Sequence, residues 1–167
     1  LLFINQGGLR FKEESIKRGI SGTQYSFVSE CVDFDSDGDV DIFVGNDYGQ
    51  NVYYENDGTG HFREDPNHPF SRAHGFSMGI ARADYDNRGS YAVSISNMYS
   101  HAGHRIVPLV EGLSPKMHEV VQNYARGNAL YELKDGKYVD MAQERGVELA
   151  EWAWGNIFFD IDNDADK

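Results

Sequence analysis

The chain has 167 residues, of which 40% are apolar and 13% aromatic, enough for the core of one folded domain and too many for a disordered segment. The formal net charge of -12 disfavours nucleic acids and anionic membranes as partners, because these carry charge of the same sign. No apolar run approaches the length of a membrane span. The single cysteine, Cys31, excludes an internal disulfide and is expected to be a small core residue.

Three short segments have the form of a β-hairpin. Each places apolar and aromatic residues on both sides of a glycine-containing turn, where glycine relieves the steric cost of a tight reversal. The segments are residues 3–11, 54–62 and 131–138, and their turns contain Gly7-Gly8, Asn56 to Gly60, and Asp135-Gly136. An aromatic residue closes each segment (Phe11, Phe62 and Tyr138). We therefore expect three hairpins of one kind.

Residues 33–41 contain five aspartates, which repel one another unless a cation lies among them. Oxygen ligands at alternate positions, with Gly38 at the sharp turn, suit Ca²⁺, which accepts about six to eight oxygens in a flexible shell. Side-chain oxygens are expected from Asp33, Asp35, Asp37 and Asp41. Asp39 is expected to supply its backbone carbonyl.

This first loop, residues 33–41, is not an EF-hand. An EF-hand needs a bidentate glutamate at its twelfth position and a helix on each side, whereas the twelfth residue counted from Asp33 is Val44. The residues that follow the loop, 40–45, are rich in β-branched and aromatic side chains, which favours a strand. We therefore expect a calcium loop between two strands.

A second loop, residues 84–92, has a related pattern that departs from the first at its fifth and ninth positions. Arg88 stands at the fifth position and Ala92 at the ninth, where the first loop has aspartates. We expect no calcium at the second loop. Instead, the Arg88 guanidinium is expected to lie near Asp84 and Asp86 as an internal substitute for the ion.

A third loop begins at Asp160 and reaches the last residue given. Asp160, Asp162, Asp164 and Asp166 are expected to bind Ca²⁺ more weakly than the first loop, because Ala165 replaces glycine and the ninth position is missing. Ahead of this loop lie four aromatic residues, Trp152, Trp154, Phe158 and Phe159. They could form a glycan-binding surface, but their alternation favours packing between sheets.

The three loops belong to an internal repeat. The distance from the closing aromatic to the first aspartate is 22 residues in every copy (11 to 33, 62 to 84, 138 to 160). An aromatic residue stands eight positions before each loop (Tyr25, Phe76, Trp152), and a large apolar residue stands six positions before it (Phe27, Met78, Trp154). Four short strands in a repeat of about 50 residues are typical of a propeller blade.

Residues 98–127 of the second copy stand between Asn97 and Asn128, where the first copy has only residues 47–50 between Asn46 and Asn51. The second copy therefore contains about 26 extra residues. Ser114 and Pro115, followed by apolar residues at helical spacing, predict a short helix whose apolar face lies on the propeller. His101, His104 and His118 could form a transition-metal or acid-base site, although a structural or ligand-contacting polar loop is the alternative. Long insertions at one end of a blade often carry specificity.

The first loop with the strand after it resembles the calcium-binding blades of FG-GAP/VCBS repeat proteins, which are built like the integrin α-subunit propeller. Residues 96–106, 125–131 and 152–155 are similar to the ASPIC/UnbV, or cartilage-acidic-protein-like, branch. The resemblance implies a seven-bladed propeller in a secreted, periplasmic or cell-surface protein. It implies no firmly assigned chemistry.

The expected fold is therefore all-β: blades of four antiparallel strands, forming a fragment of a seven-bladed propeller, with one short helical insertion. The expected units are the end of one blade (1–24), a full blade (25–65), a second blade with the insertion (74–141) and the start of a third (152–167). Because the chain begins inside a strand and ends inside a loop, we expect it to be part of a longer propeller, although several copies closing one ring is an alternative.

The expected function is a calcium-stabilised scaffold for binding or adhesion, with Ca²⁺ structural and a protein or glycan as partner. The alternative is a lyase or hydrolase acting on a polysaccharide, which requires the three histidines of the insertion to converge. No nucleophile elbow, phosphate loop or cysteine metal knuckle is present to favour other chemistry.

Overall fold

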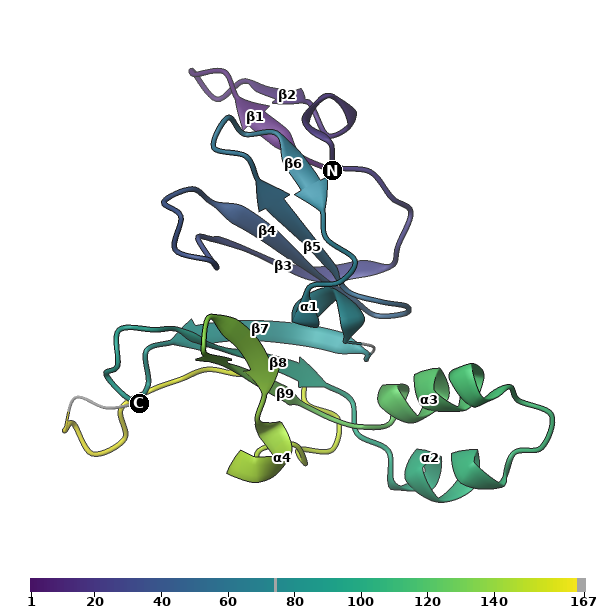
Figure 1. Cartoon of the computed structure of the whole chain (residues 1–167). Coiled ribbons are helices and arrows are strands. Elements are labelled where there is room, and N and C mark those ends of the chain that lie inside the picture. Colours follow the sequence, from purple (N-terminus) through teal and green to yellow (C-terminus); the bar gives the residue numbers. More distant parts are fainter. Residues whose placement is uncertain (74, 165–167) are drawn as a thin grey trace.

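The computed structural model describes residues 1–73 and 75–164. Two four-stranded antiparallel sheets dominate the structure and lie next to each other (Figure 1). The first sheet consists of β3 (Ser26–Val32), β4 (Asp41–Asn46), β5 (Val52–Asn56) and β6 (Phe62–Glu64). The second sheet consists of β7 (Ser77–Ala83), β8 (Ala92–Asn97), β9 (Ala129–Lys134) and β10 (Lys137–Asp140). The structure is thus mostly antiparallel sheet, as expected.

The two sheets repeat each other in detail. In both, the first two strands pair antiparallel and the acidic loop connects them, with Val32 opposite Asp41 in the first sheet and Ala83 opposite Ala92 in the second. Both pairs contain a register shift near their beginning, between Ser26 and Val28 in one sheet and between Ser77 and Gly79 in the other. The prediction that the first loop lies between strands is confirmed.

The third and fourth strands of each sheet form a hairpin, and a separate two-stranded sheet, β1 (Phe3–Asn5) with β2 (Phe11–Glu13), has the same form. All three predicted hairpins are therefore confirmed. A short helical turn, η1 (Ile16–Arg18), follows β2. The Arg18 guanidinium donates to the Gly60 carbonyl at 2.8 Å, which fixes the N-terminal hairpin beside the turn between β5 and β6.

The main core lies between the two sheets. Phe70, on the four-residue helix α1 (Pro69–Arg72), is fully buried and contacts aromatic rings of both sheets. Its ring centroid lies 5.5 Å from that of Phe43 in the first sheet and 4.9 Å from that of Tyr131 in the second. These edge-to-face contacts fix α1 as a wedge between the sheets.

Close backbone approach sets the distance between the sheets. A side chain at Gly45 on β4 would place its Cβ 2.7 Å from Val28 and 3.0 Å from the Cβ of Ser77 on β7. No larger residue fits without a shift of one of the sheets. Ser77 is itself completely buried, and its hydroxyl lies 3.1 Å from Asn51 Oδ1 and 2.9 Å from Asn97 Oδ1. Small residues and a polar link thus join the sheets.

Residues 98–127 lie between β8 and β9 and contain α2 (His101–Ile106), η2 (Val107–Leu109) and α3 (Pro115–Tyr124). The predicted helix is confirmed, since the Ser114 hydroxyl accepts a hydrogen bond from Met117 N at 3.2 Å and caps α3. The prediction that its apolar face covers the sheets is correct only at its C-terminal end, where the Tyr124 ring packs 5.1 Å from that of Phe76 and the Tyr124 hydroxyl accepts from Gly49 N. The helices project beyond the strands (Figure 1), no residue of α3 is fully buried, and α3 packs against η2.

After α4 (Ala142–Arg145), the chain returns along the far side of the second sheet. Residues 153–164 form no strand, and Trp152 makes one isolated bridge with Met98. Phe158 is half-buried against Tyr85, but Trp152, Trp154 and Phe159 are all more than half exposed. The expectation that these aromatics form a core between sheets is therefore correct for Phe158 alone, because no further sheet covers the other three within the described chain.

Cys31 also differs from expectation. It lies on the edge strand β3 of the first sheet and is exposed rather than part of the core. Its side chain lies on the face of β3 that borders an open cavity of about 430 Å³ between the first sheet and the N-terminal segment, so it is not covered by another element. Within the described part of the chain, no helix has the length and apolar character needed to cross a membrane.

Candidate functional site

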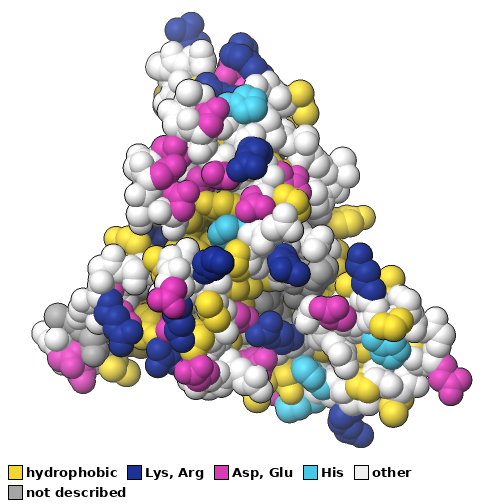
Figure 2. Space-filling model, in the orientation of Figure 1, with side chains coloured by type: hydrophobic (Ala, Val, Ile, Leu, Met, Phe, Trp, Pro, Cys, Tyr) yellow, Lys and Arg dark blue, Asp and Glu magenta, His cyan; other side chains and the backbone are white. Residues whose placement is uncertain are grey.

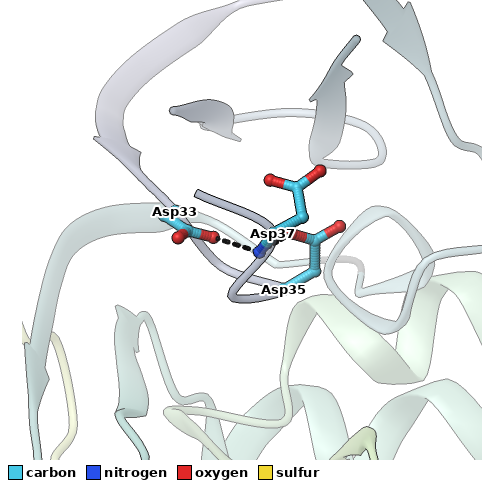
Figure 3. A group of neighbouring side chains, drawn as sticks. All are labelled: Asp33, Asp35 and Asp37. Atoms are coloured by element: carbon cyan, nitrogen blue, oxygen red, sulfur yellow. Dashed lines mark hydrogen bonds between the residues drawn. The ribbon is translucent and has the colours of Figure 1, made fainter. Parts of the chain in front are cut away.

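The first loop brings three of its five aspartates together. Asp33, Asp35 and Asp37 each offer a carboxylate oxygen, and these atoms lie within 4.8 Å of one another. Figure 3 shows Asp33 on one side of the turn and Asp35 and Asp37 on the other. This spacing allows the three side chains to share one cation.

Hydrogen bonds from the loop's own backbone hold this arrangement. Asp33 Oδ1 accepts from Ser36 N at 2.7 Å and from Asp37 N at 3.2 Å, the bond drawn in Figure 3, and Oδ2 accepts from Gly38 N at 3.0 Å. Ser36 has a left-handed backbone (φ 66°), as does Gly38 (φ 99°). These two reversals turn the amides toward Asp33, so the loop conformation follows from residues only a few positions apart.

The fourth aspartate, Asp39, carries an unsatisfied oxygen. Its Oδ1 is buried and has no hydrogen-bond partner among the described residues. Burial raises the pKa of Asp39, and the charges of Asp37, Asp41 and Asp33 raise it further. The pKa of Asp35 is also raised by burial, with added repulsion from Asp41, Asp37 and Asp33. Carboxylates that repel one another around an unpartnered oxygen are a donor set suited to a hard cation.

Asp41 has different surroundings from the other four aspartates of the first loop. Only 1% of its surface is exposed, and three donors contact its carboxylate. Tyr53 donates its hydroxyl to Oδ2 at 2.7 Å, Phe34 N donates to Oδ2 at 3.2 Å, and Asn56 N donates to Oδ1 at 3.0 Å. Burial and this hydrogen bond raise the pKa of the Tyr53 hydroxyl. Asp41 thus links the loop to β5, a role that the sequence did not suggest.

The second loop has an arginine where the first loop has Asp37. Arg88 Nε lies 3.1 Å from Asp86 Oδ2, which confirms that the guanidinium lies beside this aspartate. Asp84 receives backbone amides instead, from Arg88 N and Gly89 N, both at 2.8 Å. The arginine therefore neutralises Asp86 directly, while Asp84 shapes the turn.

In the third loop, Asp160, Asp162 and Asp164 form the second group of carboxylates whose oxygens lie within 4.8 Å. Asp160 Oδ1 accepts from Asn163 N at 2.6 Å, as Asp33 does from Ser36 in the first loop. Asp166, the fourth predicted ligand, lies outside the described residues. The repeat therefore places two similar oxygen clusters in the chain.

The histidines of the insertion do not form such a group. Within residues 1–73 and 75–164, the two aspartate groups are the ones in which three metal-binding side chains lie close enough to share an ion, and His101, His104 and His118 are in neither. His101 Nε2 lies 3.3 Å from Glu151 Oε1, and the His101 and His104 rings both pack near Tyr99, while His118 lies on α3. The convergence that a hydrolase or lyase site requires is absent from this part of the chain.

Charge is distributed unevenly over the surface. On the face shown in Figure 2, acidic side chains gather over the first sheet, and histidines lie over the helical insertion. On this face, carboxylates thus mark the first sheet, whereas imidazole side chains mark the helical insertion.

Comparison with protein families gives one match. Residues 33–90, from the first aspartate of the first loop to the turn of the second, match the model of an FG-GAP-like repeat. No curated protein matches the chain. The match covers the first loop, most of the second loop and the strands between them, β4 to β7.

Proposed function

Because the chain carries an FG-GAP-like repeat, we propose that it is a segment of a calcium-stabilised β-propeller. In this proposal each four-stranded sheet is one blade, the N-terminal hairpin is the outer half of a preceding blade, and residues 152–164 begin the next. The observation that carries the proposal is the cluster of Asp33, Asp35 and Asp37 at the connection between the first two strands of a sheet.

Calcium at this loop has a structural role. Asp33, Asp35 and Asp37 would hold the ion with their side chains, and Asp39 would contribute its backbone carbonyl as a further oxygen. When bound, the ion neutralises the mutual repulsion of these carboxylates and fixes the connection between β3 and β4.

We further propose that the protein acts outside the cytosol, as a secreted, periplasmic or cell-surface scaffold for binding or adhesion. Extracellular modules commonly bind Ca²⁺ with a Kd of about 10⁻⁴ to 10⁻³ M, which matches calcium concentrations outside cells but not inside them. A protein or glycan is the proposed partner. The projecting helical insertion supports this, since it offers a surface that the sheets do not cover.

Thermal unfolding with and without calcium tests the proposal. Calcium at about 100 times its Kd should stabilise the fold by about 2.7 kcal/mol, which corresponds to a rise in Tm of about 5–10 °C for a chain of this size. Asp35→Ala should remove most of this rise. Asp86→Ala is the matched control, because Asp86 occupies the same position in the second loop, and it should leave the calcium response intact.

Two results would contradict the proposal. One is a Tm that is the same in calcium and in excess chelator. The other is loss of the calcium response in Asp86→Ala but not in Asp35→Ala, which would place the ion elsewhere. Repeating the melts with Mg²⁺ separates specific binding from general screening of charge, because Mg²⁺ demands a more rigid octahedral shell and keeps its water.

A further inference from the structure

A pocket of about 370 Å³ lies where β3, β7 and residues 152–154 begin, at the end of the sheets opposite the acidic loops. Its volume is in the range of about 300–1,000 Å³ that is typical of small-molecule sites. The lining is mainly aromatic, with rings from Phe27, Tyr48, Phe76, Tyr124, Trp152 and Trp154. We call this cavity the aromatic pocket.

The internal repeat builds this pocket. Phe76 and Trp152 stand eight residues before their loops, and Phe27, Met78 and Trp154 stand six residues before theirs, so five residues from two equivalent positions of the repeat converge on one cavity. Strands β3 and β7 are in contact, which brings the first two copies together, and the bridge between Met98 and Trp152 fixes the third.

Two pairs of rings in the lining meet at steep angles, while Phe76 and Tyr124 are tilted by 39°. Tyr48 and Phe76 meet at 90° with centroids 5.2 Å apart, and Phe27 and Trp154 meet at 63° with centroids 6.3 Å apart. These paired rings pack against each other and line the cavity in several orientations. This is the geometry of an aromatic cage, in which each face attracts a cation through the ring quadrupole.

The charge of the lining also favours a cation. The pocket is lined by one carboxylate, Asp47, and by no lysine, arginine or histidine. Asp47 is held beside the rings because its backbone amide donates to the Tyr25 carbonyl at 2.8 Å. The chain as a whole has a net charge of -12, which attracts cations toward the surface.

Several polar groups of the lining are already engaged within the protein. The Tyr124 hydroxyl accepts from Gly49 N at 2.6 Å, and the Ser100 hydroxyl accepts from Gly103 N at 3.0 Å. The Tyr99 hydroxyl lies 3.3 Å from His101 Nδ1. A saccharide needs many polar groups to replace its hydration, so this lining suits it poorly.

We propose that the aromatic pocket binds a small organic cation that carries a quaternary or methylated ammonium group. Phe27, Tyr48, Phe76 and Trp154 would surround the methyl groups, and Asp47 would supply the counter-charge. Recognition of such cations by aromatic cages is well established as a use of the cation-π interaction. The site goes beyond the proposed scaffold function and requires that the two sheets, α3 and residues 152–154 keep their places.

Tryptophan fluorescence offers a local test, because the two tryptophans of the chain both line the pocket. Choline chloride is titrated at constant chloride concentration, and 3,3-dimethylbutan-1-ol, its uncharged analogue of equal shape, is titrated in parallel. We expect saturable quenching by choline and binding of the alcohol weaker by about tenfold or more, as cation-π contacts of about 1–2 kcal/mol predict. Isothermal calorimetry checks both affinities.

Variants identify the groups responsible. Asp47→Asn keeps the size of the side chain and should weaken choline binding by about threefold to tenfold without changing the affinity for the alcohol. Phe27→Leu, followed by fluorescence, should weaken it by a similar factor through loss of a ring face. Phe159→Leu is the matched control, because Phe159 is a similarly exposed aromatic outside the pocket, and it should have no effect.

Equal affinity for choline and the alcohol would overturn the proposal and leave an apolar cavity. So would the absence of quenching at tens of millimolar choline, or equal effects of Phe27→Leu and Phe159→Leu. Titrations are made in calcium and in chelator below the melting temperature of each. A protein that binds choline but shows no calcium-dependent Tm overturns the calcium proposal alone. A protein whose Tm depends on calcium but that does not bind choline overturns the proposal for the aromatic pocket alone.

Discussion

The first loop, after β3, and the second loop, after β7, have the same backbone but different charges. In both, the first aspartate accepts amides from the residues four and five positions later: Asp37 and Gly38 bond to Asp33, and Arg88 and Gly89 bond to Asp84. The fourth residue of each loop, Ser36 or Asn87, is left-handed. The two turns therefore share their hydrogen bonds to the first aspartate and their left-handed fourth residue, although their other side chains differ.

The acidic residues of the first loop are replaced at the fifth, seventh and ninth positions of the second, and Ser90 stands at the seventh in place of Asp39. At the fifth, Arg88 replaces a third carboxylate and pairs with Asp86. At the ninth, the buried polar pair Asp41 and Tyr53 of the first sheet is matched by the buried apolar residues Ala92 and Leu130 in the second. The same fold thus supports two arrangements. The first loop has a cluster of carboxylates suited to a cation above the buried pair Asp41 and Tyr53, whereas the second loop has an internal ion pair above buried apolar residues.

The largest expected effect comes from breaking the polar connection. Asp41→Ala leaves the Tyr53 hydroxyl and the amides of Phe34 and Asn56 without their acceptor, and it should destabilise the protein by about 3–5 kcal/mol in excess chelator. Chemical denaturation measures this value, and chelator removes any contribution from calcium.

Tyr53→Phe supplies the control for this change. It keeps the ring that packs on Phe34 and Phe70 but removes the hydroxyl. If the hydroxyl is the main orphaned group, Asp41→Ala combined with Tyr53→Phe should be more stable than the sum of the single variants predicts, by about 1 kcal/mol or more. Additive effects within about 0.5 kcal/mol would show that Asp41 acts independently of Tyr53.

Acid should weaken the first sheet through His68, which stacks on Tyr53 with ring centroids 3.9 Å apart. Burial lowers the pKa of His68 to about 4, although Asp65 and Asp41 oppose the shift. In the unfolded chain the pKa is about 6.5, so between these values the unfolded state takes up a proton that the native state does not. Stability should therefore fall as the pH drops from about 6.5 toward 4, by at most about 3 kcal/mol.

His68→Asn isolates this effect. His68 Nδ1 accepts from Phe70 N at 3.3 Å and caps α1, and asparagine is also a good N-cap, but it does not titrate. As the pH is lowered from 6.5 to 5, the unfolding free energy of the protein with His68 should fall relative to that of His68→Asn. A constant difference would show that His68 is protonated normally in the folded protein.

The smallest effect is expected at Arg88. Arg88 is mostly exposed, so the loss of its ion pair with Asp86 in Arg88→Ala should cost less than about 1 kcal/mol and less still in high salt. Arg88→Asp should convert the second loop toward the first, with a lower Tm in chelator and a new rise in calcium. The Asp35→Ala background makes the rise visible, and its absence would show that position five does not decide which loop binds calcium.

Much of the candidate metal site could be predicted because its determinants are local. The alternation of Asp33, Asp35 and Asp37, and the glycine after them, fix a turn whose hydrogen bonds span at most five residues. The same reasoning located the cap of α3 at Ser114. Asp41 was recognised as important, but its partners on β5 lie 12 and 15 residues away, and no local pattern indicates them.

The exposed residues show where local reasoning fails. The alternation of Trp152 and Trp154 indicated a core, and the apolar character of Cys31 did the same, yet all three are exposed. Alternation states which side chains share a face, whereas burial depends on whether another element covers that face. The same applies to α3, whose amphipathic pattern was correct but whose apolar face meets η2 along most of its length and the sheets only at Tyr124.

The sequence by itself determined the repeat, the hairpins and the form of the three acidic loops, because short-range hydrogen bonds and turn residues decide them. Only the tertiary structure decided that Asp41 faces Tyr53 and that Phe27, Phe76 and Trp152 enclose one cavity with Asp47. These relations depend on how the sheets pack against each other, and packing joins residues that are far apart in the chain. The repeat marked the aromatic positions in advance, and their common pocket emerged when the copies came together.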